Sequence, residues 1–195
     1  MVAPWAAADV FVSLSDNIQE TFGLTPIEAM AAGLPCLVSD WNGYRDTVSE
    51  DCGIRVPTKI PSGKMTEQLA QRYALGLESY DRYIGAVAMM TEVDVAATAT
   101  AMQSLASAPE LRQKMGAAGR QRAREYYDWS VVIKSYQQLW GELEQRRQRG
   151  QEGTQRLQRG SPLFPSPLAV FAGHASEVVD ESNRVRRTGS LEQLV

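Results

Sequence analysis

The chain has 195 residues, of which 44% are hydrophobic, and a formal net charge of −3. This mild acidity argues against a general nucleic-acid-binding protein, and two cysteines are too few for a disulfide framework. No apolar stretch of the sequence is long enough to cross a bilayer, and the first residues lack the basic start of a signal peptide. We therefore expect one cytoplasmic domain with additional material, either free or held peripherally at the inner membrane.

Strand and helix signals alternate in the first part of the chain. Val10–Leu14 predicts a buried strand, Leu34–Ser39 a second, and Gly53–Pro57 a third, weaker one. Helices are predicted between them, at Pro26–Ala32 and Tyr44–Ser49. This order predicts an α/β fold with a parallel sheet, in which ligands bind beyond the carboxyl ends of the strands.

The first of these helices has recognisable end signals. Thr25 is predicted as its N-cap, with Pro26 in the first helical position, where a missing N–H costs nothing. Glu28 follows Thr25 by three residues and completes a capping-box pattern. Gly33 is predicted to end the helix.

Two carboxylates, Glu20 and Glu28, flank a turn that contains Gly23 at the end of the first predicted strand. Carboxylates accept hydrogen bonds from sugar hydroxyls, and a helix N-terminus offers N–H groups to phosphate oxygens. The pattern alone leaves alternatives open. Glu28 is equally consistent with a capping residue, Glu20 with an exposed loop charge, and Gly23 with a backbone turn.

Neighbouring polar residues have two interpretations as well. Asp16 and Asn17 either line a pocket or form an Asx turn, and the turn is slightly favoured. Asn42 and Gly43 either approach a ligand through backbone amides or make a plain strand-to-helix turn, which is also favoured. Arg45 is expected to be a solvated helix charge.

Residues 20–35 read Glu-Thr-Phe-Gly-Leu-Thr-Pro-Ile-Glu-Ala-Met-Ala-Ala-Gly-Leu-Pro. This spaced glutamate pair, with Phe-Gly between and Glu-Ala-Met-Ala-x-Gly-x-Pro after, resembles the signature of the retaining glycosyltransferases of family 4, which have the two-domain GT-B fold. The resemblance continues at residues 109–120 and 127–130 and covers roughly residues 5–149.

The resemblance implies that residues 1–149 form the second half of a Rossmann-like donor-binding domain. It implies that Glu28 holds the ribose hydroxyls of a nucleotide-sugar and that Glu20 acts in catalysis by holding a hydroxyl of the donor sugar. Backbone amides at one turn are expected to approach the sugar and the diphosphate: Phe22, Gly23, Leu24 and Thr25.

The expected ligand is a nucleotide-sugar substrate, with no other cofactor and no metal, since the sequence has no Asp-x-Asp triplet. The acceptor is not identified. The resemblance also implies an N-terminal acceptor domain and an upstream basic pair, which have no counterpart here, so we expect a fragment that is inactive alone. Two alternatives remain open: another nucleotide-sugar enzyme of this fold, such as an epimerase, and a non-catalytic binding module.

The rest of the chain is predicted to be mostly scaffold. Thr58–Lys64 is expected to be a loop and Met65–Met90 to be partly helical. Three later helices are expected. Asp94 is predicted to cap the first, Val95–Ala106, and a capping box of Ser107 and Glu110 to begin the second, Pro109–Tyr126. Ser130 is predicted to cap the third, which ends at about Arg147.

Residues 150–195 are predicted to be a linker and a poorly ordered tail. Their first part is rich in Gln, Arg and Gly. Pro162–Phe171 is expected to dock as an extended segment, and Glu177–Val195 to be flexible. His174, the only histidine, is expected to be incidental, and Cys36 to be a small core residue.

Overall fold

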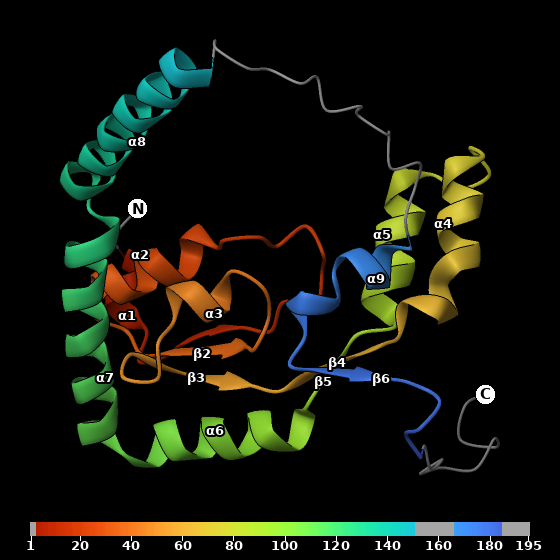
Figure 1. Ribbon diagram of the computed structural model, residues 1–195. Helices are drawn as coiled ribbons and strands as arrows, with labels where there is room; N and C mark the ends of the chain where they lie inside the picture. Colours follow the sequence, from red (N-terminus) through yellow and green to blue (C-terminus); the bar gives the residue numbers. More distant parts are fainter. Residues whose placement is uncertain (1–2, 151–165, 185–195) are drawn as a thin grey trace.

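The computed structural model describes residues 3–150 and 166–184, which form a mixed α/β fold with two three-stranded sheets (Figure 1). Predictions made for residues 151–165 and 185–195 lie outside the described residues.

The first sheet contains β1 (Phe11–Ser13), β2 (Cys36–Ser39) and β3 (Gly53–Val56), all parallel and in that order. The predicted parallel sheet is therefore confirmed. The central strand β2 is buried along its whole length. Strand β1 pairs only with β2 among the described residues, and Val12 is 40% exposed. It is an edge strand, not the buried strand expected from its composition.

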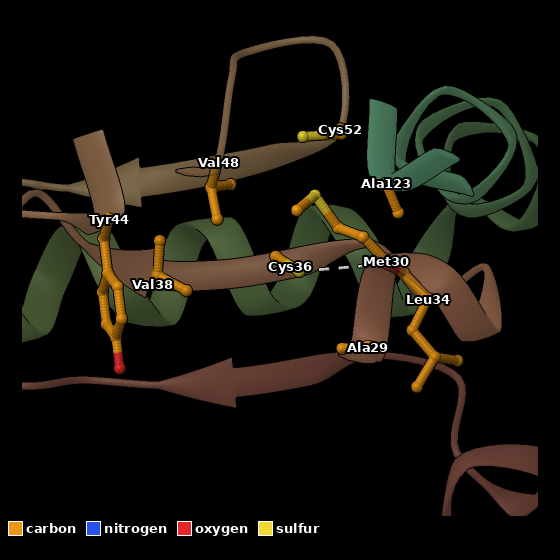
Figure 2. Close-up of a cluster of buried hydrophobic side chains, with 9 residues drawn as sticks. All are labelled: Ala29, Met30, Leu34, Cys36, Val38, Tyr44, Val48, Cys52 and Ala123. Carbon is orange, nitrogen blue, oxygen red and sulfur yellow. Dashed lines mark hydrogen bonds between the residues drawn. The ribbon is translucent and has the colours of Figure 1, made fainter. Parts of the chain in front are cut away.

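Helices cover both faces of this sheet (Figure 1). On one face lie α2 (Leu24–Ala32) and α3 (Tyr44–Thr47), and on the other lies α6 (Val95–Ser107). A short helix, α1 (Ala3–Ala7), precedes β1. The face under α2 and α3 is filled by the cluster drawn in Figure 2: Ala29, Met30, Leu34, Cys36, Val38, Tyr44, Val48, Cys52 and Ala123.

Helix α2 begins earlier than predicted. Its N-cap is Gly23 with φ 77°, and no side chain caps it, so the prediction of Thr25 as N-cap and of a capping box with Glu28 is wrong. Only glycine adopts this positive φ without strain, which lets the chain enter the helix two residues sooner. Gly33, with φ 86°, ends the helix as predicted, and Leu34 N–H donates to the Ala29 carbonyl at 3.0 Å.

The second sheet has β4 (Thr58–Pro61) at its centre, paired antiparallel with β5 (Glu92–Val93) and parallel with β6 (Glu177–Val179). The prediction of a loop at Thr58–Lys64 is therefore wrong, because both partners of this strand are distant in the sequence. A 3-10 turn, η1 (Gly63–Thr66), follows the strand.

Two helices from the segment expected to be partly helical pack beside this sheet: α4 (Glu67–Ala74) and α5 (Tyr80–Met89) (Figure 1). With the C-terminal segment they enclose the second hydrophobic core, whose buried members are Ile18, Trp41, Ile60, Tyr83, Val87, Leu168 and Ala175.

The later helices agree with prediction better than their caps do. Helix α7 (Pro109–Arg122) runs through a π-helical turn, η2 (Ala123–Tyr127), toward α8 (Trp129–Gly150). The Asp94 carboxylate caps α6 by accepting from Ala97 N–H at 2.8 Å, as predicted.

Two other predicted caps are wrong. The N-cap of α7 is Ala108, without a side-chain bond, and the Ser107 hydroxyl instead donates to the Gln103 carbonyl. At the start of α8 the Asp128 carboxylate, and not Ser130, is the acceptor: it takes the Ser130 N–H at 2.8 Å.

Helix α8 extends away from the first sheet (Figure 1). Its apolar side chains face solvent, since Ile133 is 50% exposed, Tyr136 52% and Trp140 62%. The helix therefore leaves an aromatic surface uncovered by the described residues.

Part of the expected tail is ordered. Helix α9 (Pro167–Val170), a 3-10 turn η3 (Ala172–His174) and β6 pack against β4, α4 and α5. Leu168 is fully buried. The described part of Pro162–Phe171 therefore docks as predicted, but the predicted extended conformation is wrong, because Pro167–Val170 form a helix.

Candidate functional site

The loop from Ser15 to Glu20 follows β1 and carries the first candidate carboxylate. The Ser39 hydroxyl, at the end of β2, donates to the Ser15 carbonyl at 2.6 Å. Within the loop, the Asn17 carboxamide oxygen accepts from Gln19 N–H at 2.9 Å, which is the predicted Asx turn. Glu20 N–H donates to the Asn17 carbonyl at 3.0 Å. The loop is thus held at the carboxyl end of the sheet mainly by hydrogen bonds between side chains and its backbone.

The Glu20 side chain has one polar partner among the described residues, the phenol of Tyr44. The Tyr44 hydroxyl lies 3.4 Å from the Glu20 carboxylate and 2.8 Å from the Ser13 hydroxyl. It points from α3 toward β1 (Figure 2). Burial raises the pKa of Tyr44, and the nearby Glu20 carboxylate raises it further. The phenol therefore stays protonated and can donate to Glu20.

Tyr44 is the site residue that sequence reasoning missed. It stands in the sequence as the first residue of a short predicted helix, with nothing to show that it faces Glu20. Its proximity depends on how α3 packs across the end of the sheet, which local patterns do not reveal.

Glu28 lies on α2, one turn beyond the helix start, and its side chain is exposed. It makes neither a hydrogen bond nor an ion pair with any described residue. The carboxylate is therefore free to accept hydrogen bonds from a ligand, and its capping role is excluded by the geometry at Gly23.

The turn between the two carboxylates is open to solvent. Phe22 is 44% exposed, with its ring edge-on to Tyr127 at 6.0 Å, and Leu24 is 67% exposed. Thr25 is exposed too, and no side chain caps the N-terminus of α2. The structure thus places Glu20, Gly23, Leu24 and Thr25 at the carboxyl end of β1, where the parallel sheet predicts a ligand.

Gly43 permits a close approach between the two loops of the site. A Cβ atom there would lie 2.2 Å from the Thr21 carbonyl oxygen, so any side chain would push the loops apart. The backbone N–H of Asn42 is already bonded to the His174 carbonyl at 2.9 Å. The favoured interpretation of these residues as a strand-to-helix turn agrees with this geometry.

The expectation that Arg45 is solvated is wrong. Its guanidinium lies 3.3 Å from the Asp40 carboxylate and donates to the Gly173 carbonyl at 2.7 Å. Arg55 also contacts Asp40, at 3.2 Å. Both arginines are therefore occupied, and in the described residues no lysine or arginine forms an ion pair with Glu20 or Glu28. Carboxylates that are not engaged in ion pairs are suited to accept hydrogen bonds from hydroxyl groups.

Within residues 3–150 and 166–184, no group of three or more His, Cys, Asp and Glu side chains is arranged to hold a metal ion. Across the same ranges, every helix is too short or too polar to span a membrane.

Cys36 is a fully buried core residue, as predicted, and burial raises the pKa of its thiol to about 12.

Comparison with known families addresses this same region. Residues 4–84 match the family model described as glycosyl transferases group 1. The matched stretch is less than half of the chain, but it includes the first sheet and both candidate carboxylates. The part of the chain that carries the site is thus similar to glycosyl transferases of this group.

A similar solved structure is sucrose-phosphate synthase from Thermosynechococcus elongatus, with 26% sequence identity and a TM-score of 0.49. The alignment covers 73% of this chain and 27% of that one, so the chain spans only about a quarter of the length of the synthase. Among proteins with curated descriptions, none matches the sequence.

Proposed function

We propose that residues 4–84 form the donor-binding part of a retaining glycosyltransferase, which transfers a sugar from a nucleotide-sugar to an acceptor hydroxyl. Glu28 accepts hydrogen bonds from the ribose hydroxyls, and Glu20 accepts one from a hydroxyl of the donor sugar. Backbone amides at Phe22–Thr25 face the sugar and the diphosphate.

One observation carries this proposal. Two carboxylates that have no ion-pair partner among the described residues flank the N-terminus of α2, which has no side-chain cap, at the carboxyl end of a parallel sheet. A carboxylate left unpaired at such a site is suited to accept hydroxyl hydrogen bonds, each contributing about 1.5–3 kcal/mol. The match of this stretch to glycosyl transferases group 1 supports the assignment.

The surroundings of the two glutamates are consistent with the different roles proposed for them, nucleotide binding by Glu28 and positioning of the sugar by Glu20. Glu28 is exposed and unconstrained, as a group that binds the nucleotide can be. Glu20 is partly buried and oriented by Tyr44, as a group that positions the reacting sugar must be.

We expect the chain by itself to bind donor weakly and to transfer no sugar. A helix N-terminus contributes only about half a positive charge, whereas a diphosphate brings about two negative charges next to two carboxylates. The proposal assigns neutralisation of the diphosphate to basic groups that the described residues do not supply. Incubation with a panel of sugar nucleotides and hydroxyl acceptors, followed by mass spectrometry, tests this expectation, and a glycosylated product would contradict it.

Binding of nucleoside diphosphates tests the donor site itself. We expect UDP, GDP or ADP to perturb the NMR signals of residues 20–28, and Glu28→Gln to weaken that binding about tenfold or more. Glu110→Gln is the matched control, since Glu110 is also an exposed helical glutamate near a helix start. Equal affinity for the wild type and Glu28→Gln would remove Glu28 from the site, and absence of binding by all three nucleotides would overturn the proposed function.

A further inference from the structure

The ordered C-terminal segment, residues 166–179, packs against the back of the Glu20 loop. Ile18, in this loop, is only 5% exposed and belongs to the same buried cluster as Leu168 and Trp41. Phe171 packs against that cluster. One side of the loop that carries the candidate catalytic glutamate is therefore covered by residues of the segment 166–179.

Three polar contacts and one ring contact join this segment to the loop after β2. Asn42 N–H donates to the His174 carbonyl at 2.9 Å, and the Arg45 guanidinium donates to the Gly173 carbonyl at 2.7 Å. The Ser176 hydroxyl donates to the Asp40 carboxylate. The His174 ring meets Trp41 edge-on at 5.6 Å. The segment thus contacts three residues of the turn between β2 and α3, Asp40, Trp41 and Asn42, and one residue of α3, Arg45.

Trp41 and Asn42 also hold the Glu20 loop. The Trp41 indole N–H donates to the Asn17 carbonyl at 3.0 Å, and the Asn42 carboxamide donates to the Glu20 carbonyl at 2.9 Å. The Asn17 carbonyl additionally accepts from Glu20 N–H. Two adjacent residues therefore contact the C-terminal segment with one set of atoms and the Glu20 loop with another.

The backbone conformation of Asn42 lets this residue contact the C-terminal segment and the Glu20 loop at the same time. Its φ is 35°, in the left-handed region that asparagine tolerates better than other residues with a side chain. In this conformation its backbone N–H faces His174 while its carboxamide faces Glu20. A shift of the turn changes both contacts together.

We propose that the docked segment 166–179 positions the Glu20 loop through Trp41 and Asn42, so that its docking and nucleotide-sugar binding at Glu20 stabilise each other. The identity of the ligand rests on the proposed function, and the positioning does not. Linkage requires that if docking raises the affinity for the ligand, the ligand stabilises docking by the same factor.

Hydrogen exchange of the unliganded chain tests the positioning. Leu168→Asp places a charge at a fully buried site and is expected to release the segment, whereas Val170→Asp, on the same helix but 54% exposed, is the matched control. We expect Leu168→Asp to accelerate exchange in peptides covering residues 15–22 at least tenfold, and Val170→Asp to leave it unchanged. Faster exchange in residues 166–179 with unaltered exchange in 15–22 would overturn the proposal.

A second variant keeps the test decisive if Leu168→Asp loosens the whole chain. Asn42→Gly removes the side chain whose carboxamide reaches Glu20 and still permits the positive φ of this position. It is expected to accelerate exchange in residues 15–22 while residues 95–122 keep their protection. Unchanged exchange in 15–22 would exclude Asn42 as the bridge.

The ligand arm uses UDP-glucose, GDP-glucose and ADP-glucose with the same variants, because Glu20 is proposed to hold the sugar. We expect Leu168→Asp to lower the affinity for the sugar nucleotide that binds the wild type at least threefold, and Val170→Asp to leave that affinity unchanged. We also expect this sugar nucleotide to slow exchange in residues 166–179. Equal affinity for Leu168→Asp and the wild type would refute the coupling. If the wild type binds none of the three, the proposed function fails, while the unliganded experiment still decides the positioning.

Discussion

The phenol of Tyr44 lies between two oxygen atoms of the site, 2.8 Å from the Ser13 hydroxyl and 3.4 Å from the Glu20 carboxylate. It connects β1 to the loop that follows it, and Tyr44 as a whole is only 1% exposed. The orientation of Glu20 thus depends on a residue of α3, which also contributes to the core under α2.

Tyr44→Phe is expected to keep the ring packing and remove both contacts of the hydroxyl. We expect the free energy of unfolding to fall by about 0.5–1.5 kcal/mol, the usual net contribution of an intramolecular hydrogen bond. Urea denaturation measures this change. Tyr136→Phe is the control, because Tyr136 is 52% exposed on α8, and a loss of equal size in both variants would mean that the hydroxyl contacts of Tyr44 contribute nothing.

Glu20→Ala is expected to affect turnover more than nucleotide binding, because Glu20 is proposed to orient the sugar. In the chain combined with an acceptor-binding domain, we expect turnover at saturating donor to fall about 100-fold, as misplacement of a substrate by about 1 Å can do. Affinity for the nucleoside diphosphate is expected to stay within about threefold. Weaker nucleotide binding with unaltered turnover would reverse the roles given to Glu20 and Glu28.

Gly43→Ala is expected to destabilise the chain by about 1–3 kcal/mol, the usual cost of overpacking. The added methyl would meet the Thr21 carbonyl at 2.2 Å and displace the Glu20 loop. The control is Gly85→Ala, since Gly85 lies inside α5 with no atom within 4 Å of the added Cβ. There we expect a gain of about 0.5–1 kcal/mol, because alanine favours the helix. Both values come from chemical denaturation, and two changes of the same sign would contradict the close approach at Gly43.

The buried thiol of Cys36 predicts a loss of stability at high pH. Its pKa is raised from 9.0 to about 12 in the folded chain, by burial and then by Cys52. Between these values the unfolded chain has released the proton and the folded chain still holds it, so the free energy of unfolding falls as pH rises above about 9. The slope is about 1.4 kcal/mol per pH unit for this one group.

Cys36→Ala is expected to flatten this dependence when the free energy of unfolding is measured between pH 8 and pH 10. The variant loses stability at pH 8 through the smaller side chain, so the comparison rests on the slopes. Parallel slopes for wild type and variant would show that Cys36 does not titrate in this way.

Strand β1 is expected to promote association of the isolated chain. It is an edge strand in which Val12 is 40% exposed, and Leu14, just after the strand, is 39% exposed. Such edges pair with other strands. Val12→Lys is expected to reduce the aggregated fraction in light scattering without lowering the melting temperature. Val95→Lys, at a 79% exposed position on α6, serves as control and is expected to leave aggregation unchanged.

The first sheet could be predicted from the sequence because each element carries its own local signals. A compact apolar run predicts β2, and Gly33 marks the end of α2, and both predictions are confirmed. The start of α2 was misplaced because Thr25 and Glu28 form a capping-box pattern that Gly23 overrides with a backbone conformation of its own.

The second sheet could not be predicted, because its strands have no local pattern of their own. Residues 58–61 contain a proline and become a central strand only through pairing with Glu92–Val93 and Glu177–Val179. The roles of Tyr44 and Asn42 at the candidate site could not be predicted for the same reason. Each acts through a contact across the fold, and a single sequence contains no record of such contacts.

The pairing of β4 with β6 sets an order in which the protein is completed during synthesis. Lys59 and Ile60 find their partners at Glu177 and Val178, which leave the ribosome only after more than a hundred further residues have been added. At about 5–20 residues per second this delay lasts on the order of ten seconds. During that interval the Glu20 loop exists without the segment that covers Ile18 and Trp41, so the geometry at Glu20 is completed only after that segment has been synthesised.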